Sequence, residues 1–118
     1  MTTKRRLSPL LLLLILCASR PEYDIEIKNS TGRFIRDAHV RFDDFESIGG
    51  TIAPGAKKVH GGIHRRPPPI VVVVWVSDTE QRHEVRSPLN LPPQFVGVVV
   101  FEIGSDNSVT VTPEPQKE

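Results

Sequence analysis

Two observations on the sequence from residue 20 onward predict an all-β fold. Residues 23–28 alternate apolar and charged side chains with the period of two that a half-buried strand requires. Residues 70–76 are seven apolar residues, six of them β-branched, which favours a short buried strand over a helix. We therefore expect a small antiparallel β-sandwich of six to eight strands with immunoglobulin-like architecture.

Turn-forming residues divide the expected strands. Segments 23–28 and 34–42 are predicted to form a first hairpin around Asn29-Ser30-Thr31-Gly32, with Phe34 facing the core and a bulge near Arg36. Trp75 is expected in the core. The other expected strands are 51–53, 57–60 (a weak strand or a loop), 70–76, 81–86, 95–103 and 109–111, with turns at 54–55 and 77–79 and a hairpin loop at 104–107.

Residues 1–19 have the three parts of a secretory signal peptide. Lys4-Arg5-Arg6 is a basic start, residues 7–16 are apolar apart from Ser8 and Pro9, and small residues follow. The apolar stretch is shorter than the roughly 20 residues of a membrane-spanning helix. We therefore expect an exported protein with a signal peptide at 1–19, a β-sandwich domain at 20–112 and a disordered tail at 113–118.

Cys17, the single cysteine of the chain, has two interpretations. In the first, it belongs to an ordinary signal-peptidase site that is cut after Ser19, and the protein is secreted. In the second, Cys17 carries a lipid, because Leu14-Ile15-Leu16-Cys17 resembles a lipobox except at Leu16, where that motif has Gly, Ala or Ser. The lipid would hold the protein at the cell envelope, in the periplasm or on the outer membrane.

Charge excludes one class of partner. Three of the fifteen Lys and Arg residues lie in residues 1–19, and none of the fourteen Asp and Glu residues does. The remaining chain therefore has twelve basic and fourteen acidic residues, a net charge of −2. It lacks the electrostatic footprint of a nucleic-acid-binding domain, so we expect no nucleic-acid partner.

Three features together resemble a family. The lipobox-like signal, the prolines 67–69 that precede Val73-Val74-Trp75-Val76, and the late Phe95-Val96-Gly97 look like uncharacterised bacterial envelope lipoproteins with a small β-sandwich domain. Some proteins of that kind are immunity partners of secreted toxins. The resemblance covers the signal and part of the mature chain, and no binding residue can be carried over from it.

The first candidate binding segment is basic. Residues 57–66 hold four permanent cations and two histidines, namely Lys57, Lys58, His60, His64, Arg65 and Arg66. Such a Gly-containing loop could bind a phosphate, a lipid head group or an acidic protein surface. The alternative is a solvated loop that faces the acidic residues 43–46.

The second candidate surface is apolar. Val96, Val98 and Val100 have the opposite parity from the core-facing residues of their strand, and residues 70–76 are apolar on both parities. If these two strands are neighbours, they present a continuous outer valine stripe. Either the connection 44–69 or 87–94 covers that stripe, or it binds a partner chain or a second copy of the protein.

No motif points to catalysis or to a cofactor. The sequence has no nucleophile-elbow, zincin or phosphate-loop pattern, and the histidines of His60-Gly61-Gly62-Ile63-His64 do not complete a metal site. We expect a non-catalytic envelope protein, without metal or cofactor, that binds another protein or an envelope component. The alternatives are an immunity-type inhibitor of a toxin and a self-associating structural subunit of the envelope.

Overall fold

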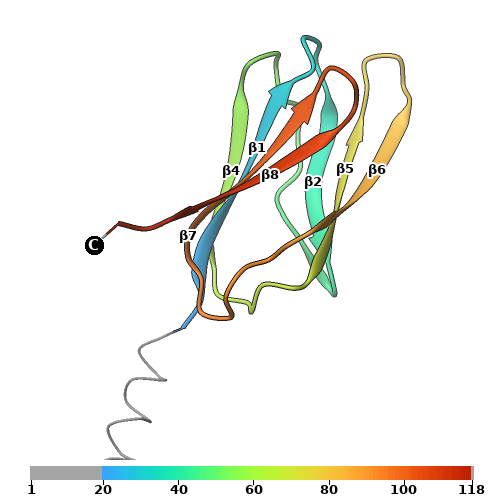
Figure 1. Cartoon of the computed structure of the whole chain (residues 1–118). Coiled ribbons are helices and arrows are strands. Elements are labelled where there is room, and N and C mark those ends of the chain that lie inside the picture. The colour runs from blue at the N-terminus through green and yellow to red at the C-terminus, as the bar shows by residue number, and fades with distance from the viewer. Residues whose placement is uncertain (1–19, 118) are drawn as a thin grey trace, which may run out of the picture.

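The computed structural model describes residues 20–117, which form eight strands in two facing sheets (Figure 1). One sheet has the strand order β4-β1-β7-β8 and the other β3-β2-β5-β6. The all-β prediction is confirmed, and the described residues include no helix that could cross a membrane. The strands are β1 (Glu22–Ser30), β2 (Arg36–Phe42), β3 (Phe45–Glu46), β4 (Lys57–Ile63), β5 (Ile70–Val76), β6 (Arg82–Pro88), β7 (Val96–Gly104) and β8 (Val109–Pro115).

β1 occupies the centre of its sheet. It pairs antiparallel with β4 on one edge and parallel with β7 on the other, so that Glu22 lies beside Val96 and Ser30 beside Gly104. The predicted hairpin between β1 and β2 is therefore wrong. The turn residues after β1 carry the chain across to the second sheet, because both edges of β1 are already taken by strands that come later in the sequence.

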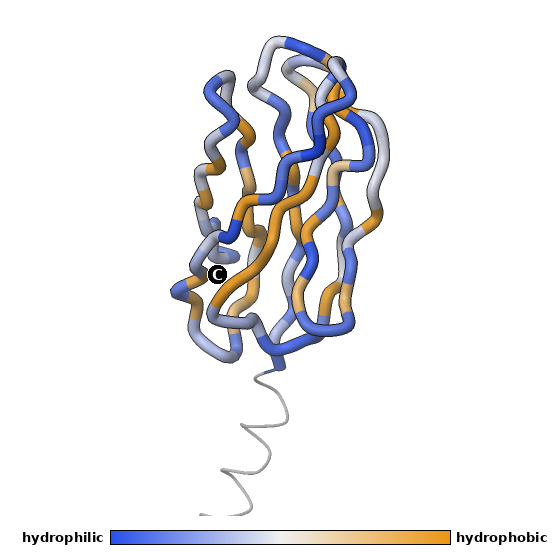
Figure 2. The backbone as a smooth tube through the Cα atoms, turned by 90° about the vertical axis from the view of Figure 1, so that its right-hand side faces the viewer, coloured by the Kyte–Doolittle hydropathy of each residue, from blue (hydrophilic) through white to orange (hydrophobic). Residues whose placement is uncertain are grey.

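The core lies between the two sheets. Tyr23, Ile25 and Ile27 of β1 are buried at alternate positions, as the period of two requires. Along most strands hydrophobic and hydrophilic residues alternate, whereas a few stretches are hydrophobic without interruption (Figure 2). Trp75 is fully buried, as predicted, and its ring stacks on His83 of the neighbouring strand at a centroid distance of 5.1 Å.

Local irregularities were predicted better than pairing. The register of β2 against β5 shifts between Arg36 and His39, where Asp37 has a φ of 52°, and this confirms the bulge. The hairpins β5–β6 and β7–β8 also form where turn residues predicted them. Phe34, by contrast, does not face the core, because Ile35 takes the buried position and pairs with Ile52 in an isolated bridge.

The chain stays ordered beyond the predicted boundary at residue 112. β8 continues to Pro115, which pairs with Gly97, and the backbone N–H of Gln116 donates to the carbonyl of Val96 at 2.9 Å. The prediction of a tail from Pro113 is therefore wrong for residues 113–115. β8 is an edge strand, so its prolines can lack an N–H without breaking a ladder on both sides.

The close approach of β8 requires glycine at position 97. Gly97 has a φ of 150°, and a Cβ there would collide with the carbonyl oxygen of Glu114 and lie 2.9 Å from the Cα of Pro115. We predict that Gly97→Ala lowers the free energy of unfolding by about 3 kcal/mol in urea denaturation. Gly32→Ala is the control, since Gly32 also has positive φ (83°) but open space around it, and should cost only about 1–2 kcal/mol. Equal losses would contradict the close approach.

Tyr23 makes stability sensitive to alkaline pH. Its hydroxyl is buried without a hydrogen-bond partner among residues 20–117. Burial raises its pKa to about 12, against a smaller opposing effect of Arg65. The folded state thus favours the neutral phenol, and this contribution should be present below pH 10 and be lost between pH 10 and 12, at most about 2–3 kcal/mol.

Tyr23 is the single tyrosine, so its ultraviolet absorbance should titrate near pH 12 in the folded protein and near 10 in urea. Tyr23→Phe should abolish this alkaline loss of stability and leave stability at pH 7 unchanged or higher, since it removes an unpaired buried hydroxyl. A titration near pH 10 in the folded protein would contradict the prediction.

Candidate functional site

The predicted basic loop is the edge strand β4, and a strand sends alternate side chains to opposite faces. Lys57 lies on the outer face, where its Nζ is 3.4 Å from Oε1 of Glu26. His64, just after the strand, has its Nε2 3.7 Å from Oε1 of Glu22. Both contacts join β4 to carboxylates of β1 on the same outer face.

The other basic residues turn toward the second sheet. His60 accepts the backbone N–H of Ile48 at Nδ1 (2.7 Å), and Arg65 donates to Asp44 (2.6 Å) and lies 5.4 Å from the centre of the Phe45 ring. Lys58 lies against Gly50, and Arg66 is exposed. The six basic residues therefore do not form one cluster. Within residues 20–117, no group of three His, Cys, Asp or Glu side chains is placed to hold a metal ion.

The continuous valine stripe is also wrong, because β5 and β7 belong to different sheets. The middle of the outer side of β5 is covered within its own sheet, whereas Ile70 at the start of the strand is 43 % exposed. Arg41 of β2 and Glu84 of β6 approach to 3.7 Å, so their side chains span β5 above Val72 and Val74. Arg82 also donates to Glu84 at 2.8 Å, and this hydrogen bond holds the pKa of Glu84 below its usual value.

The outer valines of β7, Val96, Val98 and Val100, have different neighbours from the outer valines of β5. The parallel register places Val96 beside Glu22, Val98 beside Asp24 and Val100 beside Glu26. On the other side, Val98 lies opposite Glu114 of β8. Each of these valines is half-buried, and each has a carboxylate of β1 as its neighbour in the sheet.

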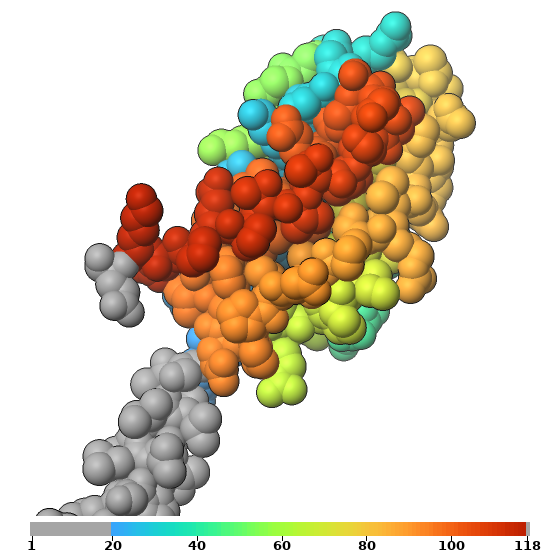
Figure 3. All heavy atoms as spheres, viewed as in Figure 1, coloured from blue at the N-terminus to red at the C-terminus, as the bar shows by residue number. Residues whose placement is uncertain are grey.

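A surface hollow of about 710 Å³ lies at one end of this valine row. Val96, Gly97 and Val98 line it, together with Glu22 and Asp24 of β1 and the residues 114–117 at the end of β8. Figure 3 shows β8 and the residues after it (red) crossing the domain and extending beyond its edge. We call this hollow the valine groove. It combines an apolar floor with a rim on which the carboxylates of Glu22, Asp24 and Glu114 outnumber one cation, Lys117.

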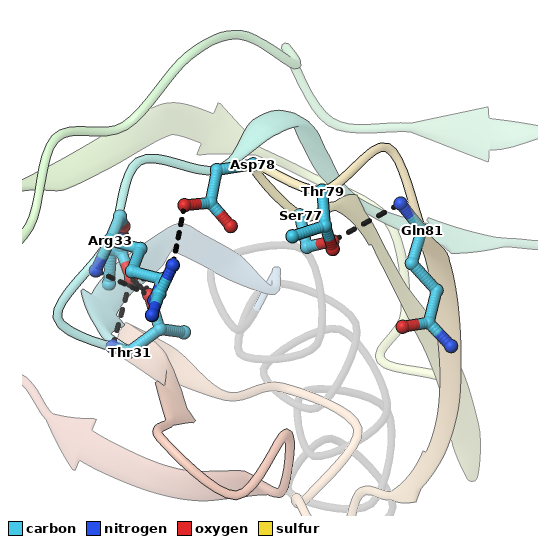
Figure 4. Close-up of polar contacts among 7 residues, drawn as sticks. Thr31, Arg33, Ser77, Asp78, Thr79 and Gln81 are labelled. Carbon is cyan, nitrogen blue, oxygen red and sulfur yellow. Dashed lines mark hydrogen bonds and ion pairs between the residues drawn. The ribbon is translucent and has the colours of Figure 1, made fainter.

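A second hollow, of about 270 Å³, lies at the opposite end of the sandwich. Three turns meet there, those between β1 and β2, β5 and β6, and β7 and β8 (Figure 1). Figure 4 shows Arg33 and Asp78 facing each other from two of these turns, with a guanidinium-to-carboxylate distance of 3.1 Å. We call this the turn hollow. Its lining includes Thr31, Arg33, Phe34, Trp75, Ser77, Asp78, Thr79, Gln81, His83, Ser105 and Asn107.

The sequence did not reveal the turn hollow, because its residues come from three separate turns. One signal was present, since the turn residues at 29–32 and 77–79 and the loop 104–107 were all recognised. What was missing was the fold that brings them to one end. Phe34 was assigned to the core, but it is 57 % exposed at this hollow.

Asn29 fixes the first of these turns. Its fully buried side-chain amide donates to the carbonyls of Arg33 (2.6 Å) and Ile52 (2.9 Å). Its side-chain oxygen accepts from the backbone N–H and the hydroxyl of Thr31, at 3.0 and 2.6 Å. Asn29 thus ties the turn at the hollow to the segment before β4.

Comparison with known proteins informs the fold only. No family model and no curated protein matches the chain. Among solved structures, the NMR structure of a protein from Eubacterium rectale is similar, with a TM-score of 0.56 over 81 % of this chain and 91 % of that chain. The sequences are 12 % identical, so the similarity shows a shared fold and says nothing about activity.

Removal of the Asn29 amide should be costly. We predict that Asn29→Ala lowers the free energy of unfolding by about 2–4 kcal/mol, because it removes four hydrogen bonds of a fully buried side chain: two to the carbonyls of Arg33 and Ile52 and two from Thr31. Urea denaturation followed by circular dichroism measures this. Asn90→Ala, at an exposed position, should stay within about 0.5 kcal/mol of the parent chain. A loss below 1 kcal/mol for Asn29→Ala would show that water replaces the amide.

Proposed function

We propose that this protein is an exported, non-catalytic binding domain of the cell envelope, and that the valine groove binds a segment of another protein. The observation that carries the proposal is the register of β1 and β7, which sets a row of valines beside a row of carboxylates. Interfaces with an apolar centre and a charged rim discriminate partners through complementary charge.

The composition of the groove defines the partner segment. Val96 and Val98 can bury apolar side chains, whereas Glu22, Asp24 and Glu114 favour Lys or Arg at the edge of the contact. Glu22 and Glu114 are exposed and so remain accessible to such cations. The partner segment is therefore apolar with flanking basic residues. Lys57 and His64 contact carboxylates of β1 on the same outer face, so they mark the border of the acidic surface on the β4 side.

Export and anchoring are part of the proposal and rest on the sequence. The signal peptide at 1–19 and Cys17 lie outside the described residues. Among the residues that the structure describes, the buried core extends from Tyr23 to Ile103. Two facing four-stranded sheets with turns gathered at the ends favour the immunoglobulin-like architecture.

Site-specific photo-crosslinking tests the groove. A photoreactive residue at Val98, in the full chain expressed in its native cells, should give one crosslinked protein partner. The same residue at Arg86, on the outer face of the other sheet, serves as the matched control and should give none. The double variant Asp24→Lys with Glu114→Lys should reduce the yield at position 98 by about tenfold, because it repels the basic partner segment.

Each outcome has a defined meaning. Equal yields from positions 98 and 86, or a yield that ignores the charge reversal, would overturn the groove. A crosslink to a second copy of the chain would instead favour the structural subunit, and a toxin as partner would favour the immunity-type inhibitor. The intact mass of the mature protein separates a lipidated start at Cys17 from a free start at Arg20.

A further inference from the structure

The turn hollow has the composition of a binding site for an uncharged polar molecule. Its two charged lining residues, Arg33 and Asp78, pair with each other at 3.1 Å, so their opposite charges offset each other at the hollow. The remaining polar lining consists of hydroxyls, side-chain amides and one imidazole. A phosphate, a carboxylate or an ammonium group would find no unpaired counter-charge among these residues.

The polar groups match a ligand that both donates and accepts hydrogen bonds. Gln81, Ser105 and Asn107 are exposed at the hollow, and each of their side chains can do both. The hydroxyls of Ser77 and Thr79 lie 2.9 Å apart, and the backbone N–H of Gln81 donates to the Ser77 hydroxyl at 3.2 Å (Figure 4). Each hydroxyl of a hydroxyl-rich ligand can likewise both donate and accept a hydrogen bond.

Apolar contacts complete the site. Phe34 is 57 % exposed at the hollow and offers a flat face against which the C–H groups of a sugar ring can pack. Trp75 also lines the hollow, and its indole N–H is a buried donor without a partner among residues 20–117. Such an unsatisfied donor is rare in native proteins, but its atom is enclosed, so a ligand in the hollow contacts Phe34 and the exposed polar lining rather than this N–H.

Size narrows the ligand further. A volume of about 270 Å³ lies just below the roughly 300–1,000 Å³ of small-molecule sites, so the ligand must be small. A hollow of this volume holds one or two sugar rings. The further rings of a longer saccharide would extend over Phe34 into solvent. We propose that the turn hollow binds a neutral saccharide, as a free sugar or as the end of a glycan, and that this site is separate from the valine groove.

The single tryptophan makes the test direct. Purified mature protein is titrated with glucose, galactose, N-acetylglucosamine and chitotriose while the fluorescence of Trp75 is followed, and calorimetry repeats each titration. At least one of these sugars should bind with a Kd of about 0.1–10 mM, the range expected for so small a ligand. Inorganic phosphate and glutamate, as charged probes, should not bind.

Variants assign the binding to the hollow. Phe34→Ala should weaken sugar binding at least about tenfold, and Phe34→Tyr should restore it, because a phenol ring keeps the packing face. Ile48→Ala is the matched control, since Ile48 is 59 % exposed but does not line the hollow, and it should leave the Kd unchanged. Asp78→Ser should free Arg33 and create binding of phosphate.

Three results would overturn the proposal. They are the absence of binding by all four sugars at about ten times the expected Kd, tighter binding of a charged probe than of any sugar, and sugar binding that survives Phe34→Ala. The groove variant Asp24→Lys with Glu114→Lys should not affect sugar binding. A failure of the valine groove and a failure of the turn hollow can therefore be told apart.

Discussion

The parallel pairing of β1 with β7 is the constraint on which this structure depends. Parallel neighbours cannot be joined by a tight turn, so the chain between them must leave the sheet and return. It uses that length to build the whole second sheet and to place β4 on the free edge of β1. The same pairing creates the valine groove, because parallel register sets side chains of equal parity side by side on one face.

The sequence predicted the features that depend on neighbouring residues, namely strand bounds, buried faces and tight turns. The strand 70–76 has the bounds expected from its apolar run, Trp75 is in the core, and the β7–β8 hairpin forms at its turn residues. Alternation along a strand shows which side chains share a face, but it does not show which strand lies next to it. This is why the β1–β2 hairpin and the β5–β7 stripe were wrong.

The candidate sites show the same limit. Lys57 and Lys58 are adjacent in the sequence and looked like one cluster, yet a strand separates them onto opposite faces. The outer valines of β7 were recognised, but their acidic neighbours on β1 were not, because those residues are more than 70 positions away in the chain. Phe34 was misplaced because the irregular backbone before β2 gives the buried position to Ile35.

Three buried polar groups bear on stability rather than on the proposed function. Asn29 satisfies its amide fully and holds a turn in place, so its role is structural. The hydroxyl of Tyr23 has no partner among residues 20–117, and Tyr23 lines neither of the two hollows, so this hydroxyl lowers stability and takes part in neither proposed site.

The indole N–H of Trp75 also has no partner among residues 20–117, although Trp75 belongs to the lining of the turn hollow. Because this atom is enclosed, it lowers stability as the Tyr23 hydroxyl does, and the proposed ligand would use the exposed polar groups and Phe34 instead. If a lipid on Cys17 anchors the protein, the five Cα-to-Cα steps from Cys17 to Glu22 span at most about 18 Å, so β1 begins close to the membrane. The valine groove lies at this same end of β1, whereas the turn hollow lies at the opposite end.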